Sequence, residues 1–133
     1  MQSEKFRDVI FEFLKNDAPQ ARKYVLSQVP MLSANPMRVE RLKSLNLTGE
    51  VSKDEQYRIA NETLEKLTQS IEKTTFLDFS ALPYFKRAPM HQDDMIYYDQ
   101  SHLNEVGSRG YALSVKELYF KHILTDNGIS SEK

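Results

Sequence analysis

Two residues in the last third of the chain, Asp99 and His102, have the types and spacing for acid–base chemistry. They stand three positions apart, where an extended stretch gives way to a helical pattern. A turn at such a junction can hold both side chains at the carboxyl end of a sheet, where α/β proteins place their sites. An imidazole there takes a proton from a hydroxyl, and a nearby carboxylate fixes its tautomer and stabilises the imidazolium. Taken alone, the spacing is also typical of a capped turn or a surface ion pair.

A cluster of histidine and acidic residues around this stretch offers a second chemistry. Imidazole nitrogens and carboxylate oxygens can bind a divalent metal ion. A solvated loop is the simpler interpretation of the same residues, so we expect no metal site and no cofactor. The cluster consists of His91, Asp93, Asp94, Asp99 and His102.

Aromatic residues near the pair could form a surface on which sugar rings stack. We expect some of them to belong to the core and the rest to cover the edge of a sheet. They are Tyr84, Phe85, Tyr97 and Tyr98. The third histidine, His122, is expected to interact with the last carbonyls of a helix.

The composition is that of one ordinary globular domain of 133 residues, with 40% hydrophobic and 28% charged residues. Eighteen basic against nineteen acidic residues leave no basic excess to drive binding to nucleic acid or anionic membranes. The absence of cysteine excludes a disulfide framework, a thiolate zinc site and a cysteine nucleophile. The sequence has no run of about 18 apolar residues, so we expect no membrane insertion and a soluble chain.

The helical elements follow from apolar spacing and from end signals. The pair Asn35-Pro36 marks a helix start, because proline at the first helical position gives up no needed N–H. Ser52 and Glu55 have the spacing of a capping box, in which each side chain bonds the backbone N–H of the other. We expect helices over about residues 4–16, from 36 to a point before 49, from 52 to about 71, and over about 103–123.

Two short runs, 24–29 and 74–79, have the β-branched and aromatic composition of strands, and a long polar loop is expected over 80–94. Strands separated by helices pair in parallel, so the sequence predicts an α/β fold. Two strands are few for a parallel sheet, which normally has several strands and both faces covered. The order of elements is therefore that of half a doubly wound domain.

The segment Tyr97–Gly107, with the sequence Tyr-Tyr-Asp-Gln-Ser-His-Leu-Asn-Glu-Val-Gly, resembles the last sequence block of the SGNH (GDSL-like) hydrolases. The likeness is to SGNH domains fused to membrane O-acyltransferases that acetylate bacterial surface polysaccharides such as lipopolysaccharide. Val25–Pro30 resembles a strand of that family, and Thr75–Asp78 resembles the strand that follows it. The resemblance covers roughly residues 5–122 and implies a partial three-layer, flavodoxin-like fold with few parallel strands.

The resemblance implies a role for each residue of the block. His102 would be the general base for a serine nucleophile, and Asp99 would orient it. Leu103 would pack beneath the turn, and Gly107 would let the following helix approach closely. The implied activity is acyl transfer or ester hydrolysis at a sugar hydroxyl, without metal or nucleotide, on the extracytoplasmic (periplasmic) side in the parent protein.

The chain departs from the family pattern in its nucleophile and oxyanion-hole blocks. It contains no Gly-Asp-Ser and no Gly-x-Asn sequence. We therefore expect residues 1–133 to be one domain that corresponds to the C-terminal portion of an SGNH domain. Loss of the serine from a nucleophile–base unit lowers the rate by about a million-fold, so the chain alone should be nearly inactive.

A rival interpretation makes the chain a non-catalytic half-domain. An unpaired strand edge is a template for a second chain, and a symmetric dimer could complete the sheet. Under this interpretation the function is self-association.

Overall fold

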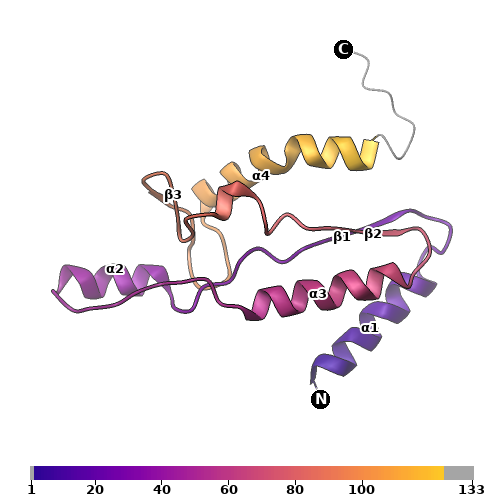
Figure 1. The fold of residues 1–133 in the computed structure, drawn as a ribbon, viewed down its shortest axis with the longest axis horizontal. Helices are drawn as coiled ribbons and strands as arrows, with labels where there is room; N and C mark the ends of the chain where they lie inside the picture. Colours follow the sequence, from indigo (N-terminus) through magenta and orange to yellow (C-terminus); the bar gives the residue numbers. More distant parts are fainter. Residues whose placement is uncertain (1, 125–133) are drawn as a thin grey trace, which may run out of the picture. The chain divides into compact units, whose positions relative to one another are not determined.

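The structure, a computed structural model, describes residues 2–124, with side chains from Glu4 onward. It combines helices with short strands, and its parallel pair of strands is compatible with the predicted α/β class (Figure 1). The described chain divides into two compact units. The first unit takes in the residues up to Met31 and Asp54–Ser80, and the second takes in Leu32–Lys53 and the residues from Ala81 on.

The first unit contains α1 (Gln2–Asn16), β1 (Lys23–Leu26), α3 (Gln56–Gln69) and β2 (Thr74–Leu77). β1 pairs in parallel with β2, as predicted, with Lys23 opposite Thr74 and Leu26 opposite Leu77. Both strands are two residues shorter than the runs that predicted them. α3 packs against β2, and α1 contacts α3 (Figure 1).

A buried asparagine fastens α3 to the chain that follows β1. The side chain of Asn61 donates to the carbonyl of Gln28 (3.0 Å) and accepts from the amide of Gln28 (2.8 Å). Ser27 makes a comparable bridge, because its hydroxyl accepts the amides of Phe79 and Ser80. These bonds satisfy backbone groups just where the two strands end and the ladder stops.

The expected capping box at the start of α3 is wrong. The Ser52 hydroxyl contacts the hydroxyl of Ser33 (3.3 Å), since Ser52 lies in an extended stretch whose neighbour Lys53 bridges to Leu32. α3 begins later, at Gln56, where the carboxylate of Asp54 accepts the backbone N–H (2.8 Å).

The apolar side of α1 is wider than a single buried face. The spacing groups Phe6, Val9, Ile10, Phe13 and Leu14 together, but among them only Leu14 is buried. Ile10 is half-buried, whereas the remaining three side chains are exposed.

The second unit contains α2 (Pro36–Ser44), a 3-10 turn (Pro83–Phe85), β3 (Met90–His91), β4 (Asp94–Met95) and α4 (Glu105–Tyr119). α2 begins as predicted, with the Asn35 side chain accepting the amides of Met37 and Arg38. A π-helical segment, Phe120–Leu124, continues α4. The stretch predicted to be a loop forms the 3-10 turn and an antiparallel β3–β4 hairpin instead.

The core of the second unit gathers under the start of α4. Phe85, Ile96 and Tyr97 are fully buried, and the buried Tyr84 hydroxyl donates to the carbonyl of Gly107 (3.1 Å). A Cβ at Gly107 would lie 2.0 Å from the Ile96 carbonyl oxygen, so only glycine lets α4 come this close. α4 therefore starts at a fixed position directly after the stretch that carries Asp99 and His102.

Within residues 2–124, no helix is both long and apolar enough to span a membrane.

Candidate active site

Asp99 and His102 lie in a tight turn that leads into α4. Tyr97 and Leu103 face each other across an antiparallel bridge, and the amide of Tyr98 donates to the carbonyl of His102 (2.8 Å). Asn104 then ends the turn and caps the helix, because its side chain accepts the amide of Gly107 (2.8 Å). The short loop thus has both ends fixed by backbone hydrogen bonds.

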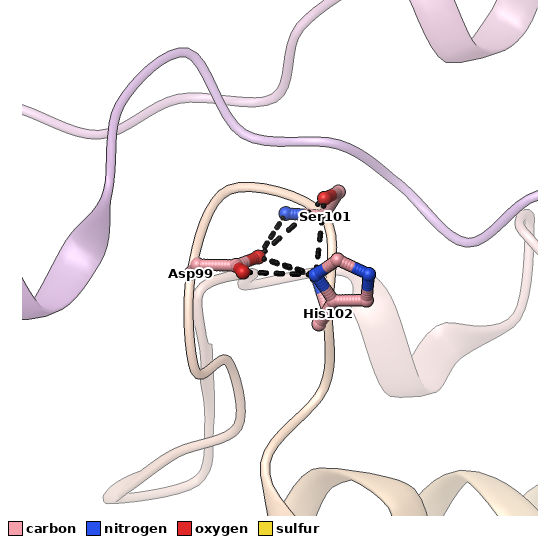
Figure 2. A network of polar contacts seen from close by, with 3 residues as sticks. All are labelled: Asp99, Ser101 and His102. Atoms are coloured by element: carbon pink, nitrogen blue, oxygen red, sulfur yellow. Dashed lines mark hydrogen bonds and ion pairs between the residues drawn. The ribbon is translucent and has the colours of Figure 1, made fainter.

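The carboxylate of Asp99 has two roles in this turn (Figure 2). Its Oδ1 accepts the backbone N–H groups of Ser101 and His102, each at 2.8 Å. Its Oδ2 lies 2.8 Å from Nδ1 of His102. Through Oδ1 the carboxylate caps the turn, as the spacing suggests. Through Oδ2 it orients the imidazole, as catalysis would need. The structure brings the two predicted site residues together.

This contact determines which nitrogen of the imidazole is available. A carboxylate accepts hydrogen bonds, so the Nδ1 atom that it contacts carries the proton, and in the neutral ring Nε2 keeps its lone pair. In Figure 2 the second ring nitrogen points away from Asp99 and Ser101. The imidazole is therefore held in the tautomer of a general base, with Nε2 directed outward.

The hydrogen bonds to Asp99 favour its ionised form. The backbone N–H of Ser101 has the largest effect, followed by the His102 side chain, and together they lower the pKa of the Asp99 carboxyl from 3.8 to about 2. A partner that stays ionised at neutral pH can stabilise an imidazolium as it forms.

The hydroxyl of Ser101 also lies close to the imidazole. Ser101 Oγ is 3.4 Å from Nδ1 of His102 and 3.4 Å from Oδ1 of Asp99. It therefore contacts the nitrogen that already donates to Asp99, on the opposite side of the ring from Nε2. From this position the hydroxyl cannot deliver its proton to the Nε2 lone pair.

The pair is open to solvent. The side chain of His102 is 74% exposed and that of Asp99 is 33% exposed. Acyl transfer needs a nucleophile on the Nε2 side and donors for the oxyanion, in a site from which water is excluded. The turn holds an imidazole beside a carboxylate in an open setting.

Comparison with protein-family models, with curated proteins and with solved structures returns no match to this chain. The interpretation of the turn therefore rests on its own geometry and on the sequence block that it carries.

The structure separates the candidate metal ligands. Among the residues described, no group of three or more histidine or acidic side chains could hold a metal ion. His91 lies in the β3–β4 hairpin, where its ring packs on Tyr84 with 4.3 Å between centroids and its Nδ1 meets the Tyr84 carbonyl (3.1 Å). Asp93 and Asp94 are exposed at the hairpin.

The aromatic candidates divide as the sequence suggests, with most of them in the core. Tyr84, Phe85 and Tyr97 are buried, whereas Tyr98 is 70% exposed beside Asp99. His122 is exposed in the π-helical segment after α4. Only Tyr98 keeps a surface that a ligand could reach.

One residue of the turn had no role in the sequence interpretation. The carbonyl of Gln100 accepts the amide of Leu32 (2.8 Å), and the Gln100 side chain donates to the carbonyl of Ser33 (3.4 Å). These bonds join the turn to a stretch almost seventy residues earlier. An exposed glutamine in a polar loop carries no sequence signal for such a contact.

Proposed function

We propose that this chain is the C-terminal portion of an SGNH-type O-acyltransferase or esterase domain that acts on polysaccharide. Its contribution is the Asp-x-x-His part of a Ser–His–Asp unit. The single observation that supports this most strongly is the 2.8 Å contact between Oδ2 of Asp99 and Nδ1 of His102. The parallel β1–β2 pair and the tight approach of α4 at Gly107 agree with the fold that the resemblance implies.

In the proposed reaction, His102 moves a proton and Asp99 stabilises the resulting charge. Nε2 takes the proton of a serine hydroxyl as its oxygen attacks the acyl carbonyl carbon. The same nitrogen then returns the proton to the leaving oxygen. In the second half-reaction, Nε2 deprotonates a sugar hydroxyl or water, which accepts the acyl group and frees the serine. The serine belongs to a Gly-Asp-Ser block, which these 133 residues do not contain.

The test uses the longer protein in which this chain continues from a Gly-Asp-Ser block. We expect His102→Ala to abolish acetylation of the surface polysaccharide in cells, and Asp99→Asn to reduce it strongly. The matched control is His122→Ala, which changes an exposed histidine outside the turn. Unaltered acetylation in the His102 variant would remove His102 from the mechanism.

The isolated chain provides a second test. Because it has a base and no serine block, its hydrolysis of an activated acetyl ester should lie about a million-fold below that of the complete domain. A comparable turnover by the 133 residues alone would show that the nucleophile lies within them and would contradict the assignment.

A second candidate function, self-association of a non-catalytic half-domain, is favoured by the size of the sheet. In the described part of the chain, β1 and β2 form a sheet of two strands, and no third strand joins β2 on its outer side. Such an edge can accept a strand from another copy. This candidate predicts a dimer in sedimentation that forms through the sheet edge, and a strictly monomeric chain would contradict it.

A further inference from the structure

The helix α1 exposes a row of large apolar side chains. Phe6, Val9 and Phe13, which we call the α1 stripe, are 66%, 62% and 60% exposed. Leu14, on the neighbouring side of the same helix, is buried. The side of α1 that carries Leu14 therefore packs within its own unit. Among the described residues, nothing covers Val9 and Phe13 to the same degree.

The spacing of the α1 stripe is that of a helix-pairing surface. Its members stand three and then four positions apart, which is the a/d pattern of helices that pack side by side. The stripe also borders an apolar groove of about 480 Å³ between α1 and α3, to which Phe6, Ile10 and the exposed Ile59 contribute. The stripe and the groove together offer one continuous surface for a helix.

The charges beside the α1 stripe indicate which helix fits. By helical periodicity Lys5 and Glu12 lie on the same flank of the stripe, away from the buried side that carries Leu14. When two copies of α1 pack antiparallel about a two-fold axis near Val9, this flank of one copy meets the same flank of the other. Lys5 then lies opposite Glu12 of the second copy, and Glu12 opposite its Lys5. In a parallel pair, the flanks of the two copies that carry Lys5 and Glu12 would lie on opposite sides of the interface, and these pairs would not form.

The total charge of α1 disfavours a membrane surface as the occupant. The helix carries three basic and three acidic side chains, so it has no excess charge to attract anionic lipid. They are Lys5, Arg7 and Lys15 against Glu4, Asp8 and Glu12.

We propose that α1 is a self-association helix, which pairs antiparallel with α1 of a second copy through Phe6, Val9 and Phe13 and is oriented by reciprocal Lys5–Glu12 pairs. The contact is small, so the dimer is weak and forms reversibly at high concentration. It uses a different surface from the edge of β2 and does not depend on the chemistry of Asp99 and His102.

The experiment is sedimentation equilibrium of the full 133-residue chain between roughly 5 and 500 µM, a range that covers weak dimers. Val9→Glu should abolish the dimer. Lys5→Glu and Glu12→Lys should each weaken it about tenfold, because each turns two attractive pairs into repulsive ones. The double charge swap, Lys5→Glu with Glu12→Lys, should restore it.

The matched control is Glu4→Lys, which makes the same change of charge on the opposite side of α1 and should leave the dimer unchanged. Circular dichroism checks that each variant remains folded, and these four substitutions alter exposed side chains only. A chain that stays monomeric up to the highest concentration overturns the proposal. A dimer that Val9→Glu leaves intact also overturns it. The same holds if the single and the double charge variants form the dimer equally well.

Discussion

Oδ1 of Asp99 accepts the backbone N–H of His102 at 2.8 Å, and Oδ2 of the same carboxylate lies 2.8 Å from the His102 imidazole. One side chain thus shapes the turn and fixes the tautomer of the imidazole. This combination explains why a spacing typical of simple turn capping can also serve catalysis. The two interpretations of Asp-x-x-His are compatible in this structure.

The ionisation of Asp99 should mark the folded turn. Its pKa lies near 2 instead of 3.8, so the ionised carboxylate stabilises the folded state above about pH 4, and this contribution is lost as the pH falls through about 2. Carbon-13 NMR of the side-chain carboxyl during an acid titration measures this directly. A midpoint at or above 3.8 in the folded chain would contradict the hydrogen-bonding described.

Ser101→Ala should have little effect on catalysis. The Ser101 hydroxyl lies on the Nδ1 side of His102, and its backbone N–H, which bonds Asp99, is retained in the variant. We expect acyl transfer by the complete protein to stay within about threefold, since the variant removes only two long contacts, each of 3.4 Å. A loss as large as that of His102→Ala would instead identify Ser101 as a participant.

Gly107→Ala should destabilise the second unit strongly. The added methyl group would lie 2.0 Å from the Ile96 carbonyl oxygen, a backbone atom that cannot move without displacing α4 or the turn. We expect a loss of about 3 kcal/mol in the free energy of unfolding, measured with urea. The control is Gly49→Ala, whose Cβ would meet a Val39 methyl at 3.2 Å. Equal effects of both substitutions would contradict the packing at Gly107.

Asn61→Ala should destabilise the first unit. Both polar atoms of the buried Asn61 side chain bond the backbone of Gln28, which would lose two partners at once. We expect a loss of about 2 kcal/mol in urea unfolding, because two part-buried hydrogen bonds between α3 and the stretch after β1 would be lost. The control is Gln69→Ala, at an exposed glutamine of the same helix, α3. Stability unchanged by Asn61→Ala would rule out this anchoring role.

Sequence patterns predicted the elements whose determinants are local. Helical spacing located α3 and α4, the Asn35-Pro36 signal located α2, and β-branched runs located β1 and β2. The Asp99–His102 contact was also predictable, because a tight turn brings positions three apart together.

The features that the sequence left open depend on contacts between distant segments. Ser52 bonds Ser33 instead of capping α3, because a bridge between Leu32 and Lys53 holds it in an extended stretch. The β3–β4 hairpin has only two residues in each strand, too few for a period-two pattern to show. The division of α1 into a buried side and an exposed side depends on where α3 lies, and periodicity alone cannot locate α3.

The most direct test of the account is chemical rescue of the His102 base in the complete protein. We expect His102→Ala to lower kcat/KM for ester hydrolysis by about four to six orders of magnitude, and added imidazole to restore part of it by occupying the vacated position. His122→Ala, treated alike, should show neither the loss nor the rescue. A His102→Ala protein within about threefold of the unaltered enzyme would contradict the central claim that Asp99 and His102 form the acid–base part of an acyl-transfer site.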